Sequence, residues 1–297
     1  MSEFKSGFVS IIGRPNVGKS TLLNRLIGQK IAIISHKPQT TRNNVLGILG
    51  DKNYQIVFTD TPGLHVPSTK LGELMVKSAE GAMKDADAVL LLVEPKDSIG
   101  KTEEKIMDDL RDRDIPVILV INKIDTIQKE KLFSIISKYT ESFDFEAVIP
   151  ISAKHSDGID LLKEELLKHI YPGPMFYPED MVTDQPERQI TAELIREKLL
   201  YALDKEIPHG IAIEIFSMKE KKHIVEIEAN IYCEKASHKA IIIGKGGEML
   251  KTIGSQAREE IERMLEKKVL LKLWVKVKDG WRNNNYLIKN FGFEQEN

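Results

Sequence analysis

The chain of 297 residues lacks several features that would place it in particular protein classes. Its single cysteine, Cys233, permits no internal disulfide and no cysteine-based metal site, which fits a reducing compartment. The longest uninterrupted apolar runs, such as Ala88–Val93 and Val117–Ile121, are far shorter than the roughly 20 residues of a membrane-spanning helix. The start, MSEFKSGFVSIIG, lacks the pattern of a secretory signal. We therefore expect a cytoplasmic protein, with peripheral membrane contact left open.

Charge of one sign is not in excess either. The chain has 43 Lys and Arg residues against 45 Asp and Glu residues, a net charge of −2, which neither requires nor excludes a polyanionic partner. Hydrophobic residues at 41% and charged residues at 30% are typical of a folded globular protein. The length suggests about two domains, each with its own core.

Short apolar runs alternate with helical patterns in the first half of the chain. The apolar runs are residues 8–12, 55–59, 88–93, 117–121 and 147–151. The helical patterns are residues 20–27, 102–111, 131–143 and 160–170. Such alternation predicts an α/β fold with a doubly wound, mostly parallel sheet.

The pattern changes after a connector that contains four prolines, YPGPMFYPEDMVTDQPER. We predict an α/β domain at residues 1–171, a linker at 172–188 and a smaller α+β domain at 189–297. The last of these shows a helix, two strands, two helical segments separated by glycines, another strand and a short helix.

The segment GRPNVGKS matches a phosphate-binding loop, and it lies between a predicted strand and a predicted helix, as that motif requires. Its glycines let backbone N–H groups face phosphates, Lys19 supplies a positive charge, and Ser20 is expected to bind Mg²⁺. Taken alone, the motif also fits a glycine-containing turn without a ligand. The nucleotide contacts expected here are Gly13, Arg14, Pro15, Asn16, Val17, Gly18, Lys19, Ser20 and Thr21.

Two further segments fit the phosphate side of such a site. In DTPG, residues 60–63, Asp60 would hold Mg²⁺ through water and the Gly63 N–H would sense the γ-phosphate. In QTTR, residues 39–42, a threonine would close over the metal and the γ-phosphate. Thr41 is favoured over Thr40, although paired threonines also occur in solvated turns. The expected metal ligands are Ser20, Thr41 and Asp60, and Thr61, Pro62, Gly63 and Leu64 join the expected nucleotide contacts.

Two segments fit recognition of the base. Asn122, Lys123 and Asp125 follow the fourth apolar run, and a carboxylate there accepts paired hydrogen bonds from the N1–H and 2-amino groups of guanine. Adenine lacks that donor pair, so the site should discriminate strongly against ATP. Ser152, Ala153 and Lys154 follow the fifth run and would add backbone contacts.

The C-terminal part contains a Gly-x-x-Gly turn at residues 244–247 between two helical segments. KH domains use this arrangement to clamp about four nucleotides of single-stranded RNA, whereas the turn alone also fits a break between packed helices. The expected RNA contacts are Ile243, Gly244, Lys245, Gly246, Gly247 and Lys251. Ile241, Ile242 and Ile253 are expected to floor a groove for the bases, beside basic residues of 267–282. Since acidic and basic residues nearly balance over this domain, an RNA footprint would be a local patch.

Together, GRPNVGKS, QTTR, DTPG, NKID, SAK, the connector and the KH-like loop resemble Era-type bacterial GTPases, in the branch of TrmE, Era and EngA, over almost the whole chain. The resemblance implies a P-loop GTPase domain followed by a type II KH-like domain. It implies Mg²⁺ as cofactor, hydrolysis of GTP to GDP and phosphate, and binding to the 3′ region of 16S ribosomal RNA during small-subunit maturation. The resemblance further implies peripheral association with the membrane, and we expect a monomer that does not bind DNA.

Leu64 departs from Ras-like switches, in which a glutamine orients the attacking water. Because the leucine side chain cannot hydrogen-bond to water, other groups must position the attacking water. We therefore expect slow intrinsic hydrolysis of GTP. Relatives in this branch hold K⁺ through a phosphate-loop asparagine, and Asn16 is at the matching position. The expected catalytic residues are Lys19, Asn16, Thr41 and Gly63. His65 could approach the water, but a loop histidine facing solvent is the simpler interpretation.

Two other functions fit less well. A tRNA-modifying or duplicated-domain relative is disfavoured because there is one phosphate loop and no cysteine near the end of the sequence. A non-catalytic RNA scaffold is disfavoured because Lys19, Ser20 and Asp60 are all present.

Overall fold

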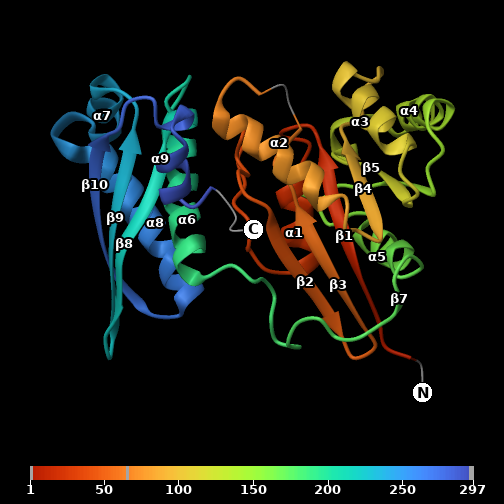
Figure 1. Ribbon diagram of the computed structural model, residues 1–297, viewed down its shortest axis with the longest axis horizontal. Coiled ribbons are helices and arrows are strands. Elements are labelled where there is room, and N and C mark those ends of the chain that lie inside the picture. The colour runs from red at the N-terminus through yellow and green to blue at the C-terminus, as the bar shows by residue number, and fades with distance from the viewer. Residues whose placement is uncertain (1–2, 65–66, 294–297) are drawn as a thin grey trace. The chain divides into compact units, whose positions relative to one another are not determined.

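The computed structural model describes residues 3–64 and 67–293, so His65 lies outside the described residues. These residues form two compact units (Figure 1). Within the described ranges, the first unit contains residues 3–32, 41–64 and 75–184. The second contains residues 185–293 together with two short segments from the N-terminal half, residues 33–40 and 67–74.

The first unit is built on a seven-stranded sheet in the order β2-β3-β1-β4-β5-β6, with β7 also pairing with β1. The strands are β1 (Lys5–Gly13), β2 (Val45–Asp51), β3 (Tyr54–Asp60), β4 (Ala88–Val93), β5 (Val117–Ile121), β6 (Ala147–Pro150) and β7 (Tyr171–Pro172). All neighbours are parallel except β2 beside β3 and β7 beside β1. The predicted mostly parallel α/β sheet is thereby confirmed.

Helices cover both faces of this sheet because neighbouring residues of a buried strand point to opposite faces. Ile11 of β1 lies in a core cluster with α1 (Lys19–Ile27) and α5 (Ile159–Leu166). Its neighbour Ile12 lies in a second cluster with α3 (Lys101–Arg111) and α4 (Lys129–Ser142). The two clusters make the sheet doubly wound.

Three elements were not predicted from the sequence, namely β2, β7 and helix α2 (Lys70–Ala82). The first of these, VLGILGD, contains two glycines and stands at the edge of the sheet, antiparallel to its neighbour. Its apolar pattern is therefore weaker than that of the central strands.

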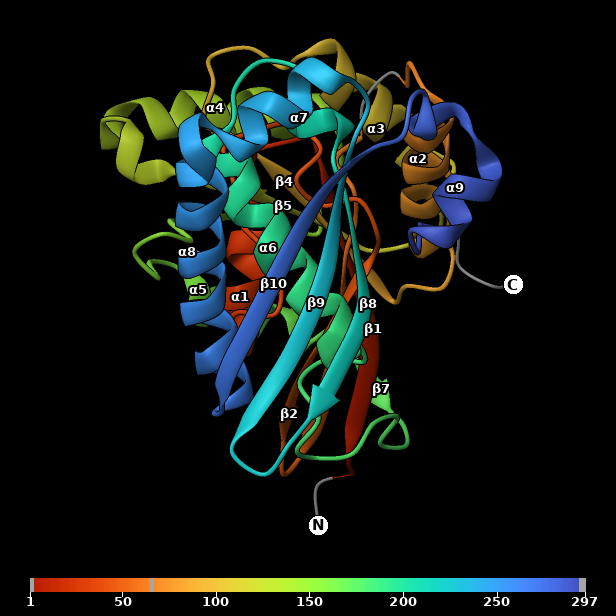
Figure 2. The same ribbon diagram turned by 90° about the vertical axis from the view of Figure 1, so that its left-hand side faces the viewer.

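The second unit contains a three-stranded sheet in the order β10-β9-β8, with β9 parallel to β10 and antiparallel to β8. Its elements are α6 (Glu187–Ala202), β8 (Ala212–Glu220), β9 (Ile224–Cys233), α7 (Ala236–Ile243), α8 (Glu248–Leu265), β10 (Lys268–Val277) and α9 (Asn285–Asn290). Buried side chains of α6, α8 and the three strands form one core cluster, so the helices pack against one face of the sheet (Figure 2). This is the order expected for the KH-like fold.

Among the described residues, no helix combines the length and the apolar composition needed to span a bilayer.

Candidate functional site

The phosphate loop lies between β1 and α1. Gly18 precedes the helix with φ of 105°, and a Cβ there would lie 2.2 Å from the Asn122 side chain, so only glycine fits. The buried Lys19 Nζ donates hydrogen bonds to the carbonyls of Gly13 and Arg14, each at 3.0 Å. Burial lowers the pKa of Lys19 to about 8, and the nearby Asp60 charge opposes that shift. A helix N-terminus and an ammonium group therefore meet here, as phosphate binding requires.

Three oxygen-bearing side chains meet beside Lys19. The Ser20 hydroxyl donates to Asp60 Oδ2 at 2.6 Å and lies 2.8 Å from the Thr41 hydroxyl. Thr41 Oγ1 is 3.5 Å from the same Asp60 oxygen. By contrast, Thr40 Oγ1 donates to the carbonyl of Lys37 at 2.6 Å. The structure thus brings Thr41, and not Thr40, to Ser20 and Asp60.

Asp60 is fully buried. Burial raises its pKa to about 6, although the Lys19 charge and hydrogen bonds from Ser20 and Thr41 act in the opposite direction. Its second oxygen, Oδ1, is buried and has no hydrogen-bond partner among the described residues. Hard cations such as Mg²⁺ prefer oxygen ligands, so this set of donors fits Mg²⁺.

The residues after Asp60 fold back on β1. Thr61 Oγ1 donates to the Ile11 carbonyl at 2.9 Å, and the Leu64 N–H donates to the Gly13 carbonyl at 3.2 Å. The Leu64 side chain packs against the core cluster that contains Ile12. It therefore offers no polar atom to a water molecule.

The predicted base-recognition residues are interlocked. Asn122 Nδ2 donates to the Val17 carbonyl at 2.8 Å, and its Oδ1 accepts from the Ala153 N–H at 3.0 Å. Asp125 Oδ1 accepts from the Ser152 hydroxyl at 2.7 Å, and this hydrogen bond lowers the pKa of the Asp125 carboxyl. The carboxylate is thus held in the charged form that the predicted pairing with guanine requires.

The predicted contacts from residues 13–21, 60–64, 122–125 and 152–154 lie at or directly after the carboxyl ends of β1, β3, β5 and β6. These ends share one edge of the sheet because the four strands are parallel, and open α/β sheets bind ligands at this edge. Thr21 lies in the first turn of α1, Pro62 in the loop after β3, and Lys154 is exposed.

Three residues that support these loops were not predicted from the sequence. Glu94, directly after β4, accepts a hydrogen bond from Lys123 Nζ. Glu103 of α3, only 3% exposed, forms an ion pair with the Arg14 side chain. Arg25 of α1 donates to two carbonyls of the 152–154 loop, both at 3.0 Å. Only Glu94 carried a sequence signal, because it follows a buried strand at the same edge.

The Gly-x-x-Gly turn separates α7 from α8. Gly244, Gly246 and Gly247 all have positive φ, at 73°, 61° and 83°, and Ile243 is the last residue of α7. A groove of about 390 Å³ begins at this turn. It is lined by Gly247, Leu250, Lys251, Gly254, Ser255 and Arg258, with Leu271 and Leu273 of β10 opposite.

The prediction that Ile241, Ile242 and Ile253 form the floor of this groove was wrong. Ile242 and Ile253 are fully buried in the core cluster, and Ile241 is 49% exposed on α7. The apolar lining instead comes from Leu250, Leu271 and Leu273. Helical periodicity sends Ile253 to the core side of α8, one position away from Gly254 on the groove side.

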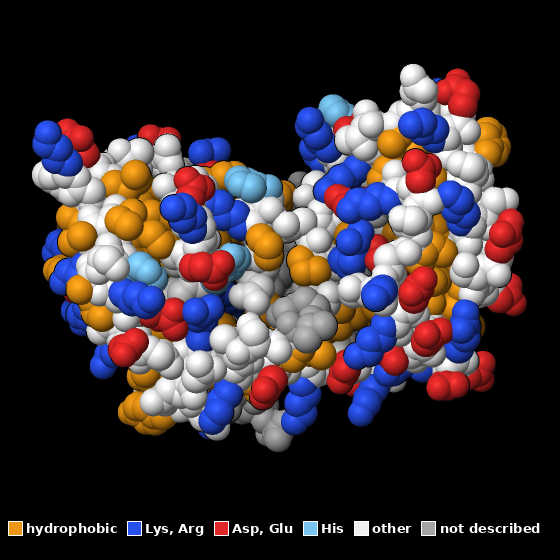
Figure 3. Space-filling model, turned by 90° about the horizontal axis from the view of Figure 1, so that it is seen from above, with side chains coloured by type: hydrophobic (Ala, Val, Ile, Leu, Met, Phe, Trp, Pro, Cys, Tyr) orange, Lys and Arg blue, Asp and Glu red, His pale blue; other side chains and the backbone are white. Residues whose placement is uncertain are grey.

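The basic residues of 267–282 were expected beside this loop, but none of them is among the described residues that line the groove. Side chains alternate along a strand, so Lys272 points to the face opposite Leu271 and Leu273. It forms an ion pair with Glu228 at 3.2 Å. Basic and acidic side chains are interspersed over the face shown in Figure 3. Positive charge in the groove comes from Lys251 and from Arg258, which sequence analysis missed.

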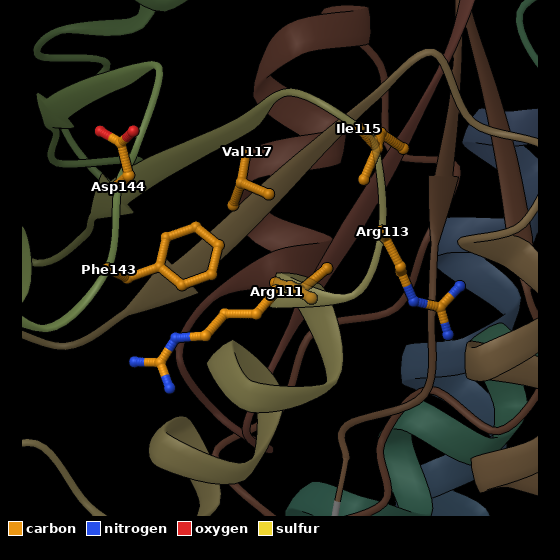
Figure 4. A pocket seen from close by; sticks show the side chains of 7 residues that line it. Arg111, Arg113, Ile115, Val117, Phe143 and Asp144 are labelled. Carbon is orange, nitrogen blue, oxygen red and sulfur yellow. The ribbon is translucent and has the colours of Figure 1, made fainter.

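A second cavity, of about 340 Å³, lies at the amino end of β5 (Figure 4). It is lined by Leu110, Arg111, Arg113, Ile115, Val117, Phe143 and Asp144. Because Val117 begins β5 and Asn122 follows its other end, this cavity is not part of the nucleotide site.

Comparison with known protein families gives two matches. The family described as 50S ribosome-binding GTPase matches residues 8–123, and the KH domain family matches residues 206–282. The two matches fall on the phosphate-loop region and on the groove region, respectively.

Individual relatives match nearly the full length. The GTPase Era of Ruminiclostridium cellulolyticum is 54% identical over 98% of this chain and 98% of its own length. The GTPase Era of Clostridium botulinum strain Okra is also 54% identical, over 98% of this chain and 99% of its own.

Two solved structures are equally extensive matches, each with a TM-score of 0.95, 38% identity, and coverage of 98% of this chain and 100% of the other. One is Era in complex with MgGDPNP and nucleotides 1506–1542 of 16S ribosomal RNA. The other is an Aquifex aeolicus Era variant bound to GDP and AlF₄⁻. With both family matches, and with 54% identity to a relative and a TM-score of 0.95 to a solved structure over 98% of its length, this chain belongs to the Era family of GTPases.

Proposed function

We propose that the chain binds GTP together with Mg²⁺ and hydrolyses it to GDP and phosphate at the site around Lys19. The observation that carries this proposal is the cluster of Ser20, Thr41 and Asp60, in which Asp60 is fully buried and its Oδ1 has no hydrogen-bond partner in the described part of the chain. The Era structures with MgGDPNP and with GDP and AlF₄⁻ support it.

Each group has a defined task in this proposal. Lys19 and the backbone N–H groups of residues 13–21 bind the phosphates, while Asp125 pairs with guanine. Ser20, Thr41 and Asp60 would hold Mg²⁺, which neutralises charge that develops on the phosphates. Asn122 and Ser152 keep the base-binding loops in register through their hydrogen bonds.

The attacking water must be positioned without the Leu64 side chain. We assign this task to backbone groups of Thr41 and Gly63, the two residues expected to contact the γ-phosphate. A water held by backbone groups alone has no side-chain base, so slow intrinsic hydrolysis follows. We also propose that K⁺ binds near Asn16, an exposed residue in the left-handed conformation, and adds positive charge to the transition state.

The second unit is proposed to bind the 3′ region of 16S ribosomal RNA in small-subunit assembly, in a manner that depends on the bound nucleotide. The groove beside the Gly-x-x-Gly turn supports this role, since it combines an apolar lining with Lys251 and Arg258. The Era complex with nucleotides 1506–1542 of that RNA is further support. RNA contacts are assigned to Ile243, Gly244, Lys245, Gly246, Gly247 and Lys251.

We place the functional boundaries at residues 1–171 for the GTPase domain, 172–188 for the linker and 189–297 for the RNA-binding domain. The protein is proposed to act as a cytoplasmic monomer with peripheral membrane association.

The two neighbouring threonines provide a matched pair of variants. Thr41→Ala should lower the single-turnover hydrolysis rate by about 100-fold, because it removes a proposed metal ligand beside Ser20 and Asp60. Thr40→Ala should have a much smaller effect, because its hydroxyl bonds to the Lys37 carbonyl. Phosphate release in a rapid-quench assay measures both. Equal losses in the two variants would contradict the assignment of Thr41.

Replacing Na⁺ by K⁺ should raise the single-turnover rate of the unmodified protein by about 10-fold or more. The variant Asn16→Gly should show no difference between the two cations, and glycine accepts the positive φ at this position. Equal rates in K⁺ and Na⁺ for the unmodified protein would remove K⁺ from the proposal.

Two lysines test whether RNA binds in the groove: Lys251 of α8 lines it, whereas Lys272 of β10 points to the other face of the sheet. Lys251→Ala should weaken binding of a 16S 3′-end oligonucleotide and reduce the slope of log K against log salt by about 0.7. Lys272→Ala should change neither quantity, because this side chain lies on the other face and pairs with Glu228. Filter binding at several salt concentrations gives both values. The reverse pattern would place the RNA on the outer face of the sheet.

A further inference from the structure

The segment that leads into Thr41 is held by helix α6. Residues 33–40 belong to the same compact unit as this helix. The Ile34 N–H donates to Glu197 Oε1 at 3.0 Å, and the Arg196 guanidinium donates to the Thr40 carbonyl. Both ends of the segment are therefore attached to two consecutive residues of α6.

These two attachments consist of charged side chains in the protein interior. Arg196 is 1% exposed and Glu197 is 2% exposed. Burying such groups costs free energy unless each is paired, and apolar side chains in the same space are often as stabilising. Arg196 is paired with Glu193 and Glu197 with Lys198. A need for stability alone does not explain this arrangement.

Lys198 links helix α6 to helix α8. Lys198 Nζ donates to Glu197 Oε2 at 2.8 Å and to the Glu260 carboxylate of α8. Burial lowers the pKa of Lys198, but the hydrogen bonds with the two carboxylates outweigh this and raise it. The ammonium group thus stays charged and ties α6 to α8, which pack together in the core cluster.

The other side of α8 forms the wall of the groove. Lys251, Ser255 and Arg258 are spaced by four and three residues, so they lie along one stripe of the helix. At about 100° per residue, Glu260 falls on the opposite side from this stripe. A shift of α8 as a rigid body therefore changes the groove and the Glu260 contact together.

Thr40 and Thr41 are joined by a peptide bond, so the other end of this connection is the group of Ser20, Thr41 and Asp60 side chains. Thr41 contacts Ser20 and Asp60, while the Thr40 carbonyl is held by Arg196. Binding of metal and γ-phosphate at Thr41 would therefore affect the position of residues 33–40, which α6 holds.

We propose that Glu197, Lys198 and Glu260, together with Arg196, form a buried relay that couples occupancy of the RNA groove to the position of Thr41. This inference rests on the proposed function and assigns its coupling to named positioning residues. RNA that shifts α8 changes how Glu197 and Arg196 hold residues 33–40. By thermodynamic linkage, GTP binding changes RNA affinity by the same factor as RNA changes GTP affinity.

The test measures the affinity of the full-length protein for a single-stranded oligonucleotide of the 16S 3′ end, with GDP and with a non-hydrolysable GTP analogue. The ratio of the two dissociation constants should be about 5-fold or more in the unmodified protein. Glu260→Gln and Glu197→Gln interrupt the relay at two points. Each variant should lower the ratio of dissociation constants by about 3-fold or more, which brings it toward one. Affinity in the presence of GDP should stay within about 2-fold, since neither residue lines the groove.

Glu259→Gln is the matched control. Glu259 is the exposed neighbour of Glu260 on α8, and its substitution should leave the ratio unchanged. Thermal unfolding of every variant confirms that it is folded. As a second measurement, RNA should tighten binding of the GTP analogue by the same ratio in the unmodified protein and in Glu259→Gln, but not in Glu260→Gln.

The outcomes separate the relay from the proposed function. If the unmodified protein shows the ratio and both relay variants retain it, the relay is overturned while RNA and nucleotide binding stand. A ratio lost equally in Glu259→Gln would also overturn it, because the effect would then belong to the helix in general. If the protein binds no RNA with GDP and none with the GTP analogue, both proposals are overturned.

Discussion

The nucleotide site depends on the burial of one carboxylate. Asp60 has no exposed surface, and its burial raises the pKa to about 6 even with Lys19, Ser20 and Thr41 beside it. The folded protein therefore holds this negative charge at a free-energy cost that its own groups only partly offset. A cation bound at this site would supply the missing compensation. The phosphate loop and the segment that carries Thr41 both converge on this carboxylate.

A network of polar contacts keeps the surrounding loops in place. Asn122 joins the phosphate loop to the loop after β6, and Glu94 holds Lys123. Such contacts hold the groups that are predicted to touch the nucleotide in place before it binds, which would reduce the entropy lost on binding. The relay through Glu197 gives the segment before Thr41 a comparable support, but one that a second ligand can alter.

The amount that sequence could predict follows from how local each feature is. The doubly wound sheet, the phosphate loop and the Gly-x-x-Gly turn were predictable, because short buried strands and fixed glycine spacings are local patterns. Edge strand β2 was missed because its glycines dilute the apolar pattern. The contacts of Arg196 with Thr40 and of Lys198 with Glu260 join residues far apart in sequence, and no spacing rule indicates them. Ile253 was wrongly placed in the groove, and Arg258 was not predicted to line it. Both errors arose because the side of α8 that faces the core depends on tertiary packing.

The most direct test of the Asp60 account is the Mg²⁺ dependence of binding to a non-hydrolysable GTP analogue, measured by titration calorimetry for the unmodified protein and for Asp60→Asn. The account predicts that Mg²⁺ tightens binding by at least about 10-fold in the unmodified protein. The same addition should have little effect in the variant, which lacks the buried charge. Equal affinity with and without Mg²⁺ in the unmodified protein, or an undiminished response in Asp60→Asn, would contradict it.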